Sequence, residues 1–274
     1  MILVTGATGT IGSHVTRLLT ERDVPFHAMS RKPGPNTVQA DFTDPRSLTV
    51  ALAGVSTVFL VTVPPTPSPA HDLALVAAAQ AASVSKIVKL SAIGTGAVHG
   101  HVVGKWHLEA EEAIADSGLA WTVLRPPSFA SNFLWYRQLI ATGAPIPNML
   151  GQARQPIVDP RDVAEVAVAA LTDDEHNGQR YDVTGPELLT FTEQATVLGR
   201  VLNRQIPTVD VDPAEQLRQT GTPEEAIPAI TTGIAWATAG NAQVTDVVPR
   251  LLGRPARTFE QWSTDHRETF TAMP

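Results

Sequence analysis

The feature that most constrains this chain is a glycine-rich turn between an apolar strand and a helix. Met1–Val4 is a short apolar run typical of a buried strand, and the spacing GxxGxxG follows at once. Gly6 permits a tight turn, Gly9 lets the backbone approach a pyrophosphate, and Gly12 lets the next helix pack closely on the strand. The positive end of that helix then faces the phosphates. The arrangement predicts a dinucleotide-binding loop, whose cofactor-binding residues we expect to be Gly6, Thr8, Gly9, Thr10, Ile11 and Gly12.

Short apolar runs alternate with longer amphipathic runs through the first half of the chain. This alternation indicates βαβ units and an α/β fold with a Rossmann-type, doubly wound parallel sheet. Asp44 and Pro45 form a typical helix start, with a capping side chain followed by proline at the first helical position. The expected strands are 1–4, 26–30, 38–40, 57–63, 86–91 and 121–124, and the expected helices are 11–22, 45–52, 70–82 and 102–117.

The pattern loosens beyond residue 127. Residues 143–156 are rich in Gly and Pro, which suggests an irregular excursion over a cleft. We therefore expect an NAD(P)-binding Rossmann region at 1–127, followed by 128–274, where the last Rossmann elements interleave with a smaller, mostly helical substrate or cap region. Helices are expected at 129–141, 160–171 and 190–202 and strands at 180–183 and 206–211, with the remainder mostly helical.

Composition excludes several classes of protein. The chain has 20 Lys+Arg against 27 Asp+Glu and no basic tract, so direct nucleic-acid binding is not expected. It has no cysteine, which excludes disulfides, thiolate metal sites and cysteine catalysis, and we expect no metal. No apolar run reaches the roughly 18 residues of a membrane span, and no basic signal-peptide region precedes the first strand. We therefore expect a cytoplasmic protein.

The end of the second expected strand indicates which dinucleotide is bound. An acidic residue there would bind the ribose hydroxyls of NAD, whereas a basic residue accommodates the 2′-phosphate of NADP. Here the strand ends with Ser30, Arg31 and Lys32, and a guanidinium can pair with a phosphate in a bidentate geometry. NADP(H) is therefore preferred over NAD(H), and the alternative is a pair of solvated surface cations.

Other cofactor contacts are expected where strands end. Asp41 and Phe42 follow the third strand, where Asp41 would accept a hydrogen bond from the adenine amino group or be a plain loop residue. Ligands of an open α/β sheet lie outside the carboxyl ends of its strands. By that rule the nucleotide path is also lined by Val61, Thr62, Val63 and Ser91.

Residues 6–12, 30–32, 40–45, 106–111, 117–126, 129–133, 159–164 and 253–259 follow one another in an order that resembles a known family. This family is the NmrA-like atypical short-chain dehydrogenases, which include NAD(P)H:quinone oxidoreductase-like members. The resemblance implies a Rossmann domain with a small C-terminal cap and a cleft between them for substrate or nicotinamide. It also implies one of two roles, either a reductase or a redox sensor without turnover.

The usual catalytic tyrosine of short-chain dehydrogenases is absent. In the pattern Tyr-x-x-x-Lys, a tyrosine one helical turn before a lysine donates a proton to the substrate oxygen, and the lysine holds the ribose. Here the spacing is His101 to Lys105, and the two tyrosines lie elsewhere, at 136 and 181. His101 could serve as the proton donor, with Lys105 as catalytic and ribose-binding lysine. The alternatives are an exposed histidine and a solvated lysine.

A cluster after the sixth expected strand could bind an aromatic substrate. The candidate substrate-binding residues are Phe129, Asn132, Phe133 and Tyr136, and the alternative is a helix that buries its aromatic residues in the core. His107 and Glu111 stand at helical spacing, and we interpret them as a surface helix pair.

These observations predict an NAD(P)H-binding atypical short-chain reductase that transfers hydride to a small conjugated carbonyl or quinone. Such acceptors tolerate the missing tyrosine, because the cofactor carries the chemistry and the proton can come from water or a histidine. The alternative is a non-catalytic NADP(H)-binding redox sensor that regulates a protein partner. We expect a monomer or homodimer with a small quinone- or enone-like substrate and no membrane partner.

Overall fold

The computed structural model describes residues 1–32, 34, 36–64, 66–98 and 101–271, and the chain divides into two compact units. The chain passes between the units several times, so neither is one continuous segment. The division expected at residue 127 stays a prediction. Unit 1 comprises Met1–Gly96, Gly104–Arg125 and Val163–Asp182, and unit 2 comprises Ala97–Val103, Pro126–Asp162 and Val183–Pro274.

Unit 1 contains a seven-stranded sheet in the order β11-β8-β5-β4-β1-β2-β3, in which every pair is parallel. The order runs outward from β1 in both directions, which is the doubly wound arrangement. This confirms the predicted Rossmann-type α/β fold. The strands are β1 (Ile2–Val4), β2 (Phe26–Ser30), β3 (Thr37–Gln39), β4 (Thr57–Leu60), β5 (Lys86–Leu90), β8 (Ala120–Leu124) and β11 (Gln179–Tyr181).

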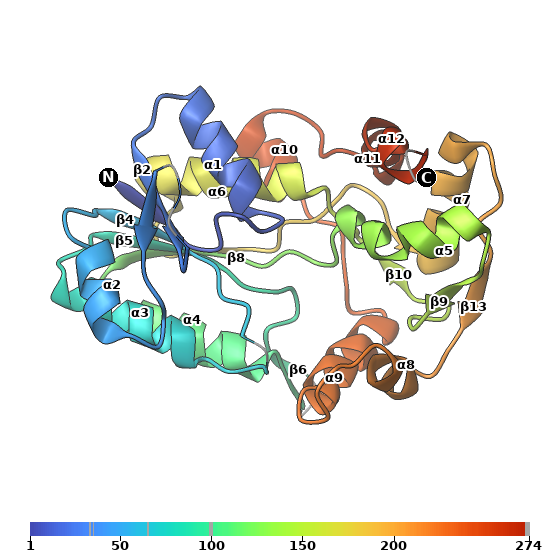
Figure 1. Ribbon diagram of the computed structural model, residues 1–274, viewed down its shortest axis with the longest axis horizontal. Coiled ribbons are helices and arrows are strands. Elements are labelled where there is room, and N and C mark those ends of the chain that lie inside the picture. The colour runs from blue at the N-terminus through green and yellow to red at the C-terminus, as the bar shows by residue number, and fades with distance from the viewer. Residues whose placement is uncertain (33, 35, 65, 99–100, 272–274) are drawn as a thin grey trace. The chain divides into compact units, whose positions relative to one another are not determined.

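Helices cover both faces of this sheet, with α2, α3 and α4 along one face and α1 and α6 along the other (Figure 1). The start of α2 is the predicted one, because the Asp44 carboxylate accepts a hydrogen bond from the Arg46 backbone N–H at 3.0 Å. The helices are α1 (Gly12–Glu21), α2 (Pro45–Ala51), α3 (Ala70–Ala81), α4 (Lys105–Ala115) and α6 (Pro160–Thr172, in unit 1 from Val163), with the short 3₁₀ helix η2 (Asp174–His176) before β11.

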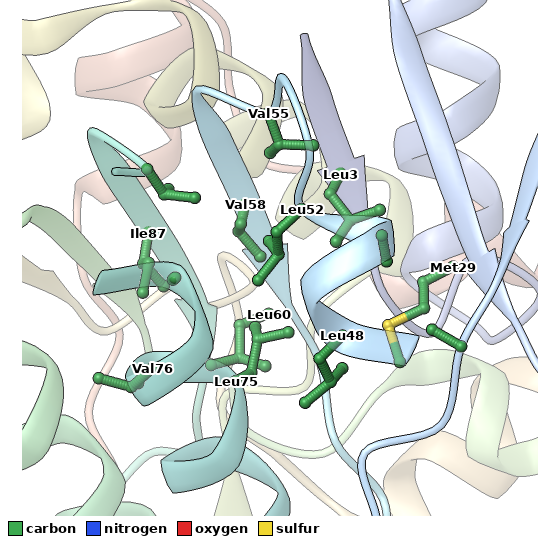
Figure 2. Packing of buried hydrophobic residues seen from close by; sticks show 14 of the residues in the cluster. Leu3, Met29, Leu48, Leu52, Val55, Val58, Leu60, Leu75, Val76 and Ile87 are labelled. Carbon is green, nitrogen blue, oxygen red and sulfur yellow. The ribbon is translucent and has the colours of Figure 1, made fainter. Parts of the chain in front are cut away.

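One hydrophobic core of unit 1 lies between the sheet and the helices α2 and α3. Leu3, Val58 and Ile87 point from three neighbouring strands toward Leu48 of α2 and Leu75 of α3 (Figure 2). The strands read as nearly continuous apolar runs because a parallel sheet is covered on both faces.

Unit 2 is mostly helical, as predicted, with small two-stranded pairings between its helices. Residues 143–156 are more regular than the sequence suggested, because β9 pairs with β13 and β10 pairs with β12. Strands of two or three residues give no detectable periodicity, so these pairings could not be predicted. The elements are β6 (Gly96–Val98, its first residue in unit 1), β7 (His101–Val103), η1 (Ala130–Tyr136), α5 (Arg137–Thr142), β9 (Ile146–Asn148), β10 (Arg154–Gln155), β12 (Leu189–Thr190), α7 (Phe191–Leu202), β13 (Thr208–Asp210), α8 (Pro213–Gln219), α9 (Ile227–Thr238), α10 (Val247–Leu252), α11 (Phe259–Asp265) and α12 (Arg267–Thr271).

The helix expected at 102–117 is shorter than predicted. It begins at Lys105, and residues 101–103 form β7 instead. The cause is Gly104, which has a φ of 58° in the left-handed region and so separates the strand from the helix. Among the described residues, no helix combines the length and apolar character that a bilayer span requires.

Two glycine substitutions test the close packing of α1 on the phosphate loop. A Cβ at Gly12 would overlap the Gly6 carbonyl oxygen and lie 2.9 Å from Ala7 Cα, whereas a Cβ at Gly233 within α9 meets nothing within 4 Å. We expect Gly12→Ala to lower the free energy of unfolding by about 1–3 kcal/mol. Gly233→Ala should raise it by about 0.5–1 kcal/mol through helix propensity. Urea unfolding measures both, and an unchanged midpoint for Gly12→Ala would contradict the close approach.

Candidate functional site

The glycine-rich loop of unit 1 is shaped to receive a phosphate. Gly6 has a φ of 60°, and the Gly9 backbone N–H donates a hydrogen bond to the Gly6 carbonyl at 2.9 Å. Thr8, Gly9 and Thr10 are exposed at the tip of the loop. Ile11 is 3% exposed, so its side chain belongs to the core and only its backbone can take part in binding. Ile11 is the N-cap of α1 and makes no side-chain cap hydrogen bond, so no side chain of that residue covers the positive end of the helix.

The loop is held against β4 by a buried threonine. The Thr5 hydroxyl accepts a hydrogen bond from the Val61 N–H at 2.7 Å and lies 2.9 Å from the Val61 carbonyl oxygen. A Cβ at Gly6 would stand 3.1 Å from Val61 Cβ, which is tighter than ordinary contact. The predicted cofactor residues of the loop and of the end of β4 are therefore adjacent. Their binding of a pyrophosphate stays a prediction.

The basic pair after β2 is exposed, as a 2′-phosphate contact requires. Arg31 and Lys32 both lie on the surface. Their backbone is anchored on each side, because the Gln39 amide donates to the Arg31 carbonyl at 3.1 Å and the Lys32 N–H donates to the Ser30 hydroxyl at 3.0 Å. The two cationic side chains are thus carried on a fixed backbone at the end of β2.

Asp41 and Phe42 stand near this pair. The Asp41 carboxylate accepts hydrogen bonds from the Thr43 backbone N–H at 2.8 Å and from the Thr43 hydroxyl at 2.7 Å. These two bonds, with smaller contributions from the charges of Arg31 and His71, lower the pKa of Asp41. The Phe42 ring stacks on His71 of α3, with ring centroids 5.2 Å apart. Asp41 is therefore an ionised acceptor in a structured turn.

A fully buried ion pair crosses three elements behind the end of β4. The Lys89 ammonium of β5 donates to Asp72 Oδ1 of α3 at 2.6 Å, and the two side chains are 0% and 1% exposed. The other oxygen of Asp72 accepts a hydrogen bond from the Thr62 hydroxyl at 2.7 Å. Thr62, a predicted cofactor residue, is thereby linked to two charged residues that the sequence analysis did not select.

A second buried network holds Ser91. The Ser91 hydroxyl donates to Glu111 of α4 at 2.6 Å. Arg125 donates two hydrogen bonds to the same carboxylate, from Nε at 3.0 Å and from Nη2 at 2.5 Å. Arg180 Nε donates a third at 3.2 Å. Burial alone would raise the pKa of Glu111, but the hydrogen bonds from Arg125 and Ser91 outweigh it, so the pKa lies below its usual value.

The interpretation of His107 and Glu111 as a surface helix pair is wrong. Glu111 is 0% exposed, and His107 is partly buried. His107 Nδ1 is enclosed and has no hydrogen-bond partner among the described residues. Burial, reinforced by the nearby charge of Lys89, lowers the pKa of His107 to about 4. The ring is therefore neutral at physiological pH.

The predicted catalytic residues do not share a helix. His101 lies in β7, whereas Lys105 is the first residue of α4, so the expected one-turn spacing is absent. The Lys105 side chain is 75% exposed, and its ammonium lies 3.7 Å from Glu109. Their roles in proton donation and ribose binding stay predictions.

Two of the predicted substrate-binding residues, Phe133 and Tyr136, belong to an aromatic cluster in unit 2. Phe133 is 1% exposed, and its ring packs 5.1 Å from the ring of Phe191 and 5.1 Å from the ring of Phe259, between centroids. Tyr136 packs on the same cluster and its burial raises the pKa of its hydroxyl. Phe129 and Asn132 are only partly buried. Phe133 therefore has a structural role in the core of unit 2, and binding of substrate by the four residues stays a prediction.

The sequence analysis missed Asp72, Lys89, Arg125 and Arg180. One signal was present, because Lys89 interrupts the apolar residues of the expected strand 86–91 in a parallel sheet. A charged residue inside such a strand is almost never buried unless it is paired. The partner could not be identified, since Asp72 lies 17 residues earlier on a helix rich in alanine.

Comparisons with known proteins agree with this geometry. A sequence model of an NAD(P)H-binding family matches residues 6–174. The NAD(P)H azoreductase of Xenophilus azovorans is 38% identical over 99% of this chain and 100% of its own length. The (4-alkanoyl-5-oxo-2,5-dihydrofuran-3-yl)methyl phosphate reductase of Streptomyces griseus is 39% identical over 98% of this chain and 99% of its own. An Escherichia coli NADPH-dependent quinone oxidoreductase solved with NADPH superimposes with a TM-score of 0.83 at 25% identity, over 97% of this chain and 99% of its own.

The depressed pKa of His107 predicts a pH-dependent stability. The pKa of His107 in the folded state is about 4, below the ordinary value of 6.5. The unfolded chain therefore binds a proton at this residue before the folded chain does. The free energy of unfolding is unaffected by this group above pH 6.5 and decreases as the pH falls toward 4. Between pH 7.5 and 5 we expect the wild type to lose roughly 2 kcal/mol of unfolding free energy through this group. Urea unfolding across this range should show a flatter profile for His107→Gln.

The matched control is His27→Gln, which removes an exposed histidine from β2. This variant should keep the wild-type slope of stability against pH. Equal slopes for wild type and His107→Gln would contradict the assignment.

Proposed function

Because this chain belongs to the NAD(P)H-binding family whose sequence model it matches, we propose that it is an NADPH-dependent reductase of small conjugated acceptors. The family membership also confirms the resemblance drawn from the sequence. The reaction we infer is transfer of a hydride to a quinone or to a carbonyl conjugated with a double bond. The observation that carries the proposal is the close approach of Gly6 to Val61 and of Gly12 to Gly6. It occurs in a chain that is similar over nearly its whole length to an azoreductase and to a furanone phosphate reductase.

The preference for NADPH over NADH rests on the end of β2. Arg31 and Lys32 are exposed there on an anchored backbone, and no carboxylate occupies the last positions of the strand. A guanidinium pairs with phosphate more strongly than with a neutral hydroxyl, since both partners are charged. A solved relative is described as NADPH-dependent, which is consistent with this preference.

Other residues of the chain then take defined roles. The backbone of the phosphate loop and the positive end of α1 bind the pyrophosphate. Asp41 accepts a hydrogen bond from the adenine, and Val61, Thr62, Val63 and Ser91 line the path of the dinucleotide. Lys105 holds a ribose, which its exposed position at the start of α4 permits.

The acceptor is an electron-poor, flat molecule. The reduced nicotinamide, when bound, supplies the hydride. His101 donates the proton to the acceptor, and Phe129, Asn132 and Tyr136 contact the substrate. Turnover is favoured over the sensing role because the azoreductase and the furanone phosphate reductase are both named for reductions.

The first test concerns cofactor choice. Arg31→Ala should weaken NADPH binding by about 1.5–3 kcal/mol, the range for a hydrogen bond to a charged group, and leave NADH binding nearly unchanged. Isothermal calorimetry with both cofactors measures this. Arg22→Ala is the matched control, because Arg22 is an exposed cation at the C-terminal end of α1. Equal losses for NADPH and NADH in Arg31→Ala would overturn the assignment.

The second test concerns the reaction. Purified protein should oxidise NADPH, followed at 340 nm, in the presence of quinones, cyclic enones or azo dyes, and the rate should depend on the acceptor. His101→Phe should slow turnover about 10²- to 10⁴-fold if it donates the proton, with cofactor affinity retained. Binding of NADPH without oxidation by any acceptor would instead support the sensor.

A further inference from the structure

We propose that the buried ion pair of Lys89 and Asp72 is a positioning device for the Thr62 hydroxyl. It commits that hydroxyl to accept a hydrogen bond from a hydroxyl or amide donor of the bound dinucleotide. Thr62 is then the contact, and Lys89 and Asp72 act through it. The inference rests on the proposed function, because it requires a dinucleotide at this edge of the sheet.

The two charges of the Lys89–Asp72 pair are costly to bury. Lys89 of β5 and Asp72 of α3 are both buried inside the α/β packing. Removing a charge from water costs several kcal/mol, and well-packed apolar residues often serve stability as well as a buried ion pair. Packing alone therefore gives little reason to place an ammonium and a carboxylate here.

The hydrogen bonds to Asp72 have a fixed direction. A carboxylate can only accept, so Thr62 must donate its single hydroxyl proton to Asp72 Oδ2, at 2.7 Å. The remaining capacity of the Thr62 oxygen consists of acceptor lone pairs. The Lys89 ammonium, 2.6 Å from Asp72 Oδ1, holds that carboxylate in place. Thr62 therefore suits a ligand group that donates, such as a ribose hydroxyl or a carboxamide N–H.

Thr62 lies beside the phosphate loop. It directly follows Val61, whose N–H and carbonyl oxygen are both joined to the Thr5 hydroxyl beside the phosphate loop. The Thr62 side chain is only partly buried, whereas its partner Asp72 is enclosed. The chain of contacts from Lys89 through Asp72 thus ends at the partly open edge where the loop and β4 meet.

The test is a double-mutant cycle on NADPH affinity. Calorimetry gives the dissociation constant for the wild type, Thr62→Val, Asp72→Asn and the double variant. We expect Thr62→Val to weaken binding about three- to tenfold, the range for one hydrogen bond, and Asp72→Asn to do the same. The double variant should be no weaker than Thr62→Val alone, because both changes remove one contact. Thr62→Ser, which keeps the hydroxyl, should bind within about twofold of the wild type.

Two lysines of β5 provide a matched control. Lys86 is also buried and ion-paired, with Asp174, but it stands at the amino end of the strand, whereas Lys89 is near the carboxyl end. Lys86→Met should lower the melting temperature and leave NADPH affinity unchanged. Lys89→Met should reduce affinity as Asp72→Asn does.

Each outcome has one meaning. Unchanged affinity in Thr62→Val, or effects of Thr62→Val and Asp72→Asn that multiply in the double variant, would overturn the positioning role while the proposed function stands. Equal losses for Lys86→Met and Lys89→Met would show a structural effect only and would also overturn it. A wild type that does not bind NADPH would overturn the proposed function itself. If Asp72→Asn or Lys89→Met does not fold, the comparison of Thr62→Val with Thr62→Ser still decides whether Thr62 is the contact.

Discussion

The edge of unit 1 where β1 and β4 end depends on one buried hydroxyl, that of Thr5. It sits where β1 ends, accepts the Val61 N–H of the chain leaving β4, and lies within 3.1 Å of the carbonyl oxygens of Phe59 and Val61. Two central strands are thereby tied together at the point where both chains must leave the sheet. The phosphate loop begins at the next residue, Gly6, so its position is set by the same contact. The Thr5 hydroxyl therefore positions both the glycine loop and the neighbouring Thr62.

Two buried carboxylates with cationic partners lie near the carboxyl ends of β4 and β5. Lys89 with Asp72, and Glu111 with Arg125, lie in the packing between the sheet and the helices α3 and α4, and each carboxylate is hydrogen-bonded as well as ion-paired. Groups of this kind are costly unless they are fully satisfied. Each pair also holds a small hydroxyl residue, Thr62 in one case and Ser91 in the other, at the end of a strand. The charges are thus arranged around strand ends, where an open α/β sheet binds its ligands.

The comparison of sequence with structure shows where pattern reasoning holds and where it fails. The strand Phe26–Ser30 and the Asp44 cap were predicted as they are found, because both depend on residues within a few positions of one another. The helix at 102–117 was predicted too long, because the left-handed conformation of Gly104 overrides the pattern around it. The aromatic run after β8 was open to two interpretations, and Phe133 packs into the core of unit 2. In the candidate site, the sequence pointed to the loop glycines and to the basic pair after β2, whose roles stay predictions, but not to the buried ion pairs.

By itself, the sequence determined the βαβ alternation, the phosphate loop, and the basic residues after β2. All three are local, since a turn, a cap or an apolar period is encoded within about one element. Only the tertiary structure decided that Lys89 meets Asp72 and that Glu111 joins Arg125 to Arg180, partners separated by 17, 14 and 69 residues. Such pairings follow from the order of strands in the sheet and the face on which each helix packs. A charged residue in a sequence states only that a partner is needed, and the fold decides which one it is.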